Sequence, residues 1–350
     1  MSSQNGLPPR GGNTGSKQPA STKKVKKKSS PFKKFMKFVA FLLIIGIIAG
    51  GGYAYYLYNQ VIDAGVDKEV PKAQLAETKP MTMLLLGTDY RPDLQGYRSD
   101  VNMVISMNPN TKSATVVSLP RDLRIDLDGY KVRKLNAYYP TFKVEEKSSG
   151  ISAEDEMKKM ISKYMDVPID YVSVVNFQGF RDVVDAVGGV DVTVDKNMCY
   201  RDTADGTDIN LKAGPQHLDG KNALDFVRYR KSNCKPKTDE SNDFERNQRQ
   251  GQVLNALVGK MQSLQGIASA GKMISAVDDN MTTDVEKAQI KSIISTYWNI
   301  SKENILFQPV TGEWRSPYVR VNEDELNKAK QALQDELAGK SVSGTTDTSS

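Results

Sequence analysis

Histidine, cysteine and tryptophan are scarce in this chain, whose 350 residues include one His, two Cys and two Trp. A single His rules out a His-rich zinc site and argues against a Ser-His-Asp triad, in which His217 would have to serve alone. Two Cys residues are too few for a zinc finger or an iron–sulfur cluster. The length of the chain is ample for a buried core, which excludes a miniprotein held together by disulfides.

Acidic residues are absent from positions 1–37, which hold ten Lys or Arg residues. The whole chain carries a formal charge of +6, so removing these ten charges leaves −4 on positions 38–350. The segment 1–37 is rich in Ser, Gly and Pro and has too little apolar content to fold. It is therefore predicted to be a basic disordered tail, which either contacts anionic lipid or only sets the membrane topology; the second role is favoured.

A long uncharged run follows the basic tail. Residues 38–58 contain no charged side chain, and as a helix they would extend about 30 Å, the thickness of the hydrocarbon core of a bilayer. A cleaved signal peptide is the alternative, but its apolar core is normally shorter. We therefore expect an uncleaved transmembrane helix with a cytoplasmic N-terminus, because the positive charges precede the span.

The rest of the chain would then lie outside the cell, anchored by a single pass. Residues 59–80 are expected to form a juxtamembrane linker, 81–338 an exported domain and 339–350 a polar tail. No other apolar run is long enough to span a membrane.

Short apolar runs alternate with amphipathic stretches in the expected domain. Strands are predicted at 81–87, 101–107, 113–119, 171–176, 190–194, 304–310 and 318–321. Helices are predicted at 152–165, 178–187, 220–230, 243–264, 284–298 and 323–337. This alternation indicates an α/β fold, a layered α-β-α domain around a central mixed sheet.

Arg and Asp residues repeatedly follow or precede the apolar strands. The segments are GTDYR (87–91), RSD (98–100), LPRD (119–122), KLNA (134–137), RYR (228–230) and DFERNQRQ (243–250). Arg presents a rigid fork of donors to phosphate oxygens and keeps its charge, and two carboxylates at strand ends suit Mg²⁺. Each motif alone is ordinary turn or surface chemistry. Their co-occurrence at strand ends, where open α/β sheets place ligands, favours a phosphate site.

The same motifs occur in a familiar order. GTDYR, RSD, SLPRD, KLNAY, FQGFRDVVDAVGGVDVTV, LDGKNALDFVRYR and DFERNQRQ together resemble the LytR-CpsA-Psr family of membrane-anchored cell-wall ligases, closely over residues 82–260. The resemblance implies a phosphotransferase that moves an anionic glycopolymer, such as teichoic acid or capsular polysaccharide, from a polyprenyl-pyrophosphate carrier to peptidoglycan. It also implies that 81–338 is a catalytic domain, that the envelope is of the Gram-positive type and that Mg²⁺ supports the reaction.

The resemblance assigns roles to individual residues. Asp89 and Asp100 match the metal-associated carboxylates, and either is a candidate base for the attacking hydroxyl. Together with Arg98 and Arg121 they form the expected catalytic set. The expected pyrophosphate-binding set is Arg98, Arg121, Lys134, Arg228, Arg230, Asp243, Arg246 and Gln250.

Two stretches depart from the family pattern. Tyr139-Pro140 and a charged loop, KVEEKSSG, stand where the family often has Gly-Gly. A longer loop containing Cys234 separates Arg230 from Asp243. Because an exported domain permits disulfides, a Cys199–Cys234 bridge is favoured over two free thiols.

Two other functions remain open from the sequence. A hydrolase would use the same site to cleave polyprenyl pyrophosphate with water, and a non-catalytic regulator would only bind the lipid. Two carboxylates beside the Arg set favour an enzyme over a binder. Nucleic acid is not an expected partner, since the basic cluster lies in an unfolded tail and the domain is mildly acidic.

Overall fold

The computed structural model describes residues 69–89, 98–203, 206–261, 280–297 and 300–340. The chain divides into two units, Met1–Gly52 and Tyr53–Ser350, and all of the described residues belong to the second. The predicted basic tail, the predicted span 38–58 and the C-terminal tail from 341 lie outside them. Within the described ranges, no helix combines the length and the apolar character needed to cross a membrane.

A six-stranded mixed sheet forms the centre of the second unit, as predicted. Its strand order is β11 (Met281–Thr283), β6 (Tyr171–Asn176), β1 (Met81–Thr88), β2 (Ser99–Asn108), β3 (Ser113–Ser118) and β12 (Ile305–Pro309). Strand β1 is parallel to β6, and β3 is parallel to β12, whereas β2 runs antiparallel to both of its neighbours. The carboxyl ends of β1, β3, β6 and β12 therefore meet at one edge.

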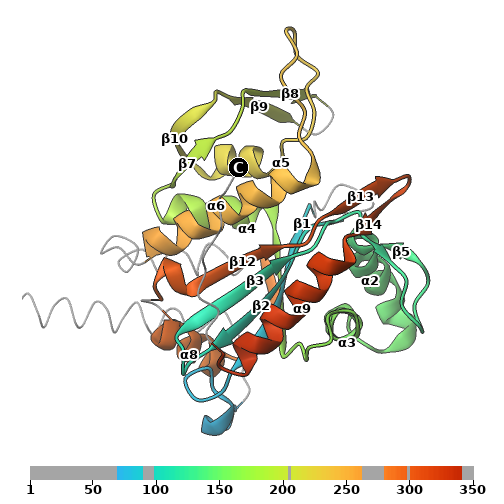
Figure 1. Ribbon diagram of the computed structural model, residues 1–350, viewed down its shortest axis with the longest axis vertical. Coiled ribbons are helices and arrows are strands. Elements are labelled where there is room, and N and C mark those ends of the chain that lie inside the picture. Colours follow the sequence, from blue (N-terminus) through green and yellow to red (C-terminus); the bar gives the residue numbers. More distant parts are fainter. Residues whose placement is uncertain (1–68, 90–97, 204–205, 262–279, 298–299, 341–350) are drawn as a thin grey trace, which may run out of the picture. The chain divides into compact units, whose positions relative to one another are not determined.

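One face of this sheet is covered by three helices, α2 (Tyr138–Ser149), α3 (Ala153–Met165) and α9 (Glu323–Leu337). Alternation along β1 sends Leu84 and Leu86 into this layer, where they are fully buried with Met157 and Leu333. Figure 1 shows these helices on one side of the central strands. This layer is the larger hydrophobic core, and it supports the strands from behind.

The charged segment KVEEKSSG was predicted to be a loop, and this prediction is wrong. Its first seven residues form the later turns of α2, and Gly150 ends the helix in a left-handed conformation with φ of 70°. Pro140 does not prevent this helix, because it lies in the first turn, where a missing N–H costs no helical hydrogen bond. Tyr138, Tyr139 and Phe142 give the helix its buried side.

The other face of the sheet meets helices α4 (Phe177–Ala186), α5 (Gly220–Arg228) and α6 (Asp243–Met261). Two small sheets pack on these helices: β7 (Val190–Val194) with β10 (Gly214–Leu218), and β8 (Met198–Asp202) with β9 (Thr207–Leu211). Figure 1 shows this second layer on the opposite side of the central strands from α9. Its own core includes Val184, Val190 and Phe226.

Two glycines allow the tight passage from α4 into β7. The segment VDAVGGVDV predicts this passage from its sequence, because glycines let a helix turn into a strand. Gly188 and Gly189 have φ values of 79° and 83°, which other residues rarely adopt. A Cβ on Gly189 would also collide with the His217 ring. His217, which the sequence predicts to be a loop residue without a catalytic role, lies in the strand β10 instead, and its Nδ1 is 2.7 Å from Oδ1 of Asp191.

The remaining elements frame the sheet. They are η2 (Lys72–Gln74), β4 (Arg124–Ile125), β5 (Arg133–Lys134), η3 (Leu135–Ala137), α8 (Lys287–Tyr297), η4 (Lys302–Asn304), β13 (Gly312–Arg315) and β14 (Tyr318–Val321). The described end of the predicted linker packs on α8, since the backbone N–H of Ala76 donates to Gln289 at 2.9 Å. Ala76 itself is fully buried.

A disulfide bond joins Cys199 and Cys234, the pair proposed from the sequence. It ties β8 to the loop between α5 and α6, which connects Arg230 to the start of α6. Hydrogen bonds support the same attachment, because the side-chain Nδ2 of Asn233 donates to the backbone carbonyl oxygen of Arg201 and the Arg201 N–H donates to Oδ1 of Asn233. Loop and sheet are thus held together at one end of the second layer.

The bond makes a stability prediction. The free energy of unfolding of the double variant Cys199→Ser/Cys234→Ser should be about 2–4 kcal/mol lower than that of the native chain, because the unfolded chain regains the conformational freedom that the bridge removes. The two cysteines are 35 positions apart. Urea unfolding followed by circular dichroism measures the change. A reductant should lower the stability of the native chain but not that of the variant; equal sensitivity would contradict the assignment.

Candidate functional site

A cavity of about 320 Å³ lies between the sheet and the second helical layer. Its floor is formed by the sheet side chains that point away from the larger core, among them Leu85, Val101 and Met103. The helices supply the opposite wall with Phe177, Phe180, Val183, Leu224, Val227, Val253, Leu254 and Leu257. Most of the lining is apolar, so the cavity suits a hydrocarbon group.

Charged and polar side chains from the predicted site line the same cavity. They are Asp100, Arg121, Arg228, Arg230, Arg246 and Gln250. They come from the start of β2, the end of β3, the end of α5 and the first turns of α6. The structure therefore brings together six predicted residues that span 150 positions of the chain, with four guanidinium groups at one apolar chamber.

Asp100 reaches the cavity through an irregularity in the sheet. Gly87 pairs with Val101, and Thr88 pairs with Ser99, so Asp100 is the extra residue of a β-bulge. Such a bulge turns a side chain away from the regular alternation of a strand. Oδ1 of Asp100 accepts a hydrogen bond from the Arg121 guanidinium at 2.6 Å. The bulge thus places a carboxylate directly against an arginine of the site.

Asp122 is a residue of the site that the sequence prediction omitted. Its carboxylate is buried and accepts from Lys134 Nζ at 2.9 Å and from Arg121 Nε at 3.4 Å. Burial by itself raises the pKa of Asp122, but the Lys134 hydrogen bond and the charges of Arg121, Lys134 and Arg230 bring the pKa below its ordinary value. Asp122 is therefore an anion that holds two cations of the site. Its signal in the sequence is its place next to Arg121.

Backbone hydrogen bonds fasten the two segments that carry this network. The N–H of Asn136 donates to the carbonyl oxygen of Arg121 at 2.9 Å, and the N–H of Leu135 donates to that of Leu123 at 2.9 Å. The short strands β4 and β5 continue the pairing. Arg121 and Lys134 are thus held on paired main chains, which limits the entropy lost when they bind a ligand.

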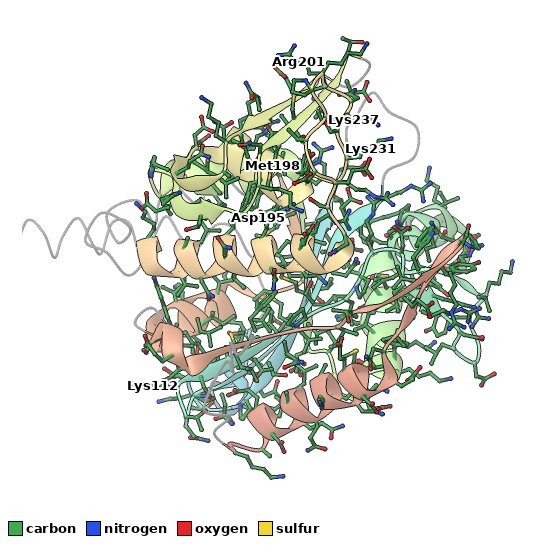
Figure 2. All side chains as sticks on the ribbon, turned by 45° about the horizontal axis from the view of Figure 1, so that its top comes forward. Lys112, Asp195, Met198, Arg201, Lys231 and Lys237 are labelled. Carbon is green, nitrogen blue, oxygen red and sulfur yellow. A yellow bond between two sulfur atoms is a disulfide. The ribbon has the colours of Figure 1, made fainter. Side chains whose placement is uncertain are left out.

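Arg249 is a structural residue that supports Arg228 and Arg230. Only 1% of its side chain is exposed, and it donates to both carboxylate oxygens of Asp195 at 2.7 Å. Its Nη1 also donates to the carbonyl oxygen of Tyr229 at 3.2 Å, so it fixes the backbone between the two site arginines. Figure 2 shows Asp195 above α6, which carries Arg249. Arg228 is held further by the Phe177 ring, 4.4 Å from its guanidinium carbon.

The other predicted site residues lie beside the cavity rather than in its lining. Asp89 and Arg98 flank the β1–β2 turn, where the Arg98 N–H donates to Oδ1 of Asp89 at 2.6 Å. Lys134 joins the site through Asp122. Asp243 begins α6, but its side chain lies outside the described residues.

The positions of the acidic side chains decide whether they could bind the predicted Mg²⁺. Among the described residues, no group of three or more His, Cys, Asp or Glu side chains could hold a metal ion. Asp89 and Asp100 form a smaller set at adjacent ends of β1 and β2. Mg²⁺ is compatible with such a set, since it usually keeps several waters and takes phosphate oxygens from the substrate.

Fold and site together define an α/β protein in which four arginines and an aspartate line one largely apolar cavity. The LytR_cpsA_psr family model matches residues 55–335. The chain belongs to the LytR-CpsA-Psr family.

Named relatives support this assignment. The polyisoprenyl-teichoic acid–peptidoglycan teichoic acid transferase TagU of Bacillus mycoides (strain KBAB4) is 34% identical over 279 residues, 76% of this chain and 84% of TagU. The corresponding transferase TagV of Bacillus subtilis (strain 168) is 31% identical over 318 residues, 85% of this chain and 76% of TagV.

Solved structures of two related proteins have a similar fold. The crystal structure of B. subtilis TagV matches with a TM-score of 0.58 at 30% identity, covering 74% of this chain and 98% of that one. The structure of TagT bound to LI-WTA matches with a TM-score of 0.55 at 25% identity, covering 78% of this chain and 95% of that one.

The lowered pKa of Asp122 makes a prediction about pH. A carboxyl whose pKa is lower in the folded state contributes stability above its unfolded pKa, and this stability is lost as the pH falls through the folded value. Asp122→Asn should therefore lose about 1–3 kcal/mol near neutral pH, and the deficit relative to the native chain should shrink below about pH 4.

Urea unfolding of both proteins across this pH range measures the deficit. Asp126→Asn is the matched control, because Asp126 pairs with Arg124 but leaves 58% of its side chain exposed. The control should change stability by less than about 1 kcal/mol. A deficit for Asp122→Asn that is independent of pH would contradict the role of its charge.

Proposed function

We propose that this protein transfers an anionic glycopolymer of the teichoic acid type from a polyprenyl-pyrophosphate carrier to peptidoglycan. The observation that carries the proposal is one cavity with apolar walls and four arginines at its charged end. A polyprenyl pyrophosphate has the matching chemistry, an apolar chain attached to a multiply charged head. The TagU and TagV relatives, which are named as teichoic acid transferases, support the same substrate class.

The reaction is a displacement at phosphorus. A hydroxyl oxygen of peptidoglycan bonds to the phosphorus that carries the glycopolymer, and the bond from that phosphorus to the oxygen of the polyprenyl phosphate breaks. The products are a phosphodiester and polyprenyl phosphate. The hydroxyl proton goes to a carboxylate, for which Asp100 and Asp89 are the candidates.

The arginines contribute by stabilising charge. Arg121, Arg228, Arg230 and Arg246 line the end of the cavity where the pyrophosphate would lie. Their guanidinium groups would stabilise the negative charge that develops on the leaving phosphate. Arg121 is oriented for this role by Asp100 and Asp122, and Arg230 by the Arg249 contact with Tyr229.

Mg²⁺ is the proposed metal, with Asp89 and Asp100 as its candidate protein ligands. A carboxylate that takes the hydroxyl proton cannot freely hold the metal as well, so the two roles fall to different residues. A bound Mg²⁺ would neutralise phosphate oxygens of the donor. Residues 38–58 are proposed as a single transmembrane helix, with the domain from 81 outside the cell. This location would present the cavity to a carrier lipid in the outer leaflet.

The test uses the full-length chain in detergent with a polyprenyl-pyrophosphate-linked glycopolymer and peptidoglycan oligomers. Arg121→Ala and Asp100→Ala should each lower the rate of joined product by about 100-fold or more, since each removes a group that acts on the reacting phosphate or hydroxyl. Gel electrophoresis of the joined product measures the rate.

Arg201→Ala is the matched control, because Arg201 is exposed, pairs with Asp208 at 3.1 Å and is not among the residues that line the cavity (Figure 2 labels Arg201). Its rate should equal that of the native chain. Unchanged transfer in both site variants would reject the site assignment. Free polyprenyl phosphate without joined product would favour the hydrolase instead.

The metal proposal has a separate test. Removal of divalent cations with EDTA should abolish transfer, and Mg²⁺ should restore it, because an aspartate carboxylate and the pyrophosphate oxygens together form an oxygen-rich site. Calcium and manganese are the comparison ions. Full transfer in EDTA would reject the metal.

A further inference from the structure

A second hollow of about 450 Å³ adjoins the phosphate end of the cavity. We call it the Trp314 groove; it is lined by Pro120, Arg230, Ser241, Asn242, Asn247, Thr311, Gly312, Trp314 and Val319. Arg230 lines both spaces, and Pro120 precedes Arg121 in the chain. Whatever is attached to a phosphate bound at the arginines therefore has the groove within its reach.

The groove has a fixed wall, the β13–β14 hairpin. The N–H of Val319 donates to the carbonyl oxygen of Asp122 at 2.8 Å, and Leu123 forms a bridge with Val319. At the base of the hairpin, both the N–H and the hydroxyl of Thr311 donate to Glu325, at 2.7 and 2.6 Å. The hairpin is thus attached directly to the segment that carries Arg121 and Asp122.

Trp314 is the large side chain of this wall, and 51% of it is exposed. Lys134 Nζ lies 5.3 Å from the centre of its ring, and Lys134 is in turn held by Asp122. Covering the exposed part of such a ring with a ligand would be favourable, because it removes apolar area from water. The ring is therefore oriented by the catalytic network and is still open to a partner.

Two polar atoms of the groove lack partners among the described residues. Nδ2 of Asn247 and Oγ of Ser241 are buried without a hydrogen bond, and only 5% of Asn247 is exposed. Buried polar groups normally have partners, since leaving one unsatisfied costs free energy. Both residues line the groove, so a rotation of either side chain would present its unpartnered atom to a ligand with hydroxyl groups, which offers a donor to Ser241 and an acceptor to Asn247.

We infer that the Trp314 groove binds a pyranose ring next to the reacting phosphate, with Trp314 as its stacking platform. The C–H face of a pyranose packs on the negative face of an aromatic ring, while its hydroxyls meet amide and hydroxyl groups at the edges. The groove offers this combination in Trp314, Asn247 and Ser241. The inference rests on the proposed function, in which both the donor polymer and the acceptor are glycans that meet at the phosphate.

A binding experiment tests the groove without requiring transfer. The chain has two tryptophans, Trp314 and Trp298, so a Trp298→Phe background makes Trp314 the only indole reporter. The full-length protein is titrated with chitotetraose, a peptide-free model of the acceptor glycan, and separately with a lipid-free teichoic acid oligosaccharide phosphate. At least one should quench the fluorescence saturably, and the one that does identifies the source of the sugar.

Calorimetry on the native chain compares variants with the same two probes. Trp314→Ala should weaken binding of the quenching glycan by about tenfold, and Trp314→Phe should recover part of the loss, because an aromatic face remains. Ser241→Ala should weaken it by about fivefold. Arg315→Gln is the matched control on the same strand, where Arg315 pairs with exposed Glu313 at 2.7 Å; its affinity should be native.

Kinetics separates this inference from the proposed function. In the transfer assay, Trp314→Ala should raise the KM of the glycan identified above by about tenfold and leave the KM of the other substrate unchanged. The absence of quenching by both probes, or native affinity and KM in Trp314→Ala, would overturn the inference while transfer itself stands. Quenching by a stem peptide but by neither glycan would also overturn it.

Discussion

The site depends on one buried carboxylate, that of Asp122. It accepts from Lys134 and Arg121, and its backbone carbonyl accepts from Val319 of the β13–β14 hairpin. Segments far apart in the chain therefore converge on a single residue. Without an anion there, several cations gathered for a phosphate would repel one another before the substrate arrived. Asp122, which has no part in the proposed reaction, therefore holds the Arg121 and Lys134 side chains in place.

The two faces of the sheet have separate tasks. Leu84 and Leu86 pack on α2, α3 and α9 in a filled core, whereas Leu85 between them faces the cavity. The apolar residues of α4, α5 and α6 on the other side face the cavity instead of packing on the sheet. A filled core on one side supplies stability, and an apolar chamber on the other leaves room for a ligand. The β-bulge at Asp100 joins these tasks by turning a strand residue toward the chamber.

Much of the fold could be read from local patterns. The apolar runs that became β1, β3, β6 and β7 have clear periodicity and turn residues at their ends, so their positions were predicted correctly. The helix α2 was missed because its later turns are charged and its buried side chains lie before Lys143. The small strands β8 and β9 were missed because their sequence is mostly polar and only their pairing with each other defines them as strands.

The sequence by itself determined the residue types of the site and their order along the chain. Arg and Asp at strand ends carry their chemistry wherever they lie, and their ordered motifs indicated the family. The tertiary structure decided which of these side chains contact one another and which line the cavity. Val183 and Leu257 have the pattern of ordinary core in the sequence, yet they line a cavity, because only packing determines whether an apolar side chain meets protein or an open space. Asp122, Arg249 and Trp314 acquired their positions in the same way, through contacts between segments that are distant in the chain.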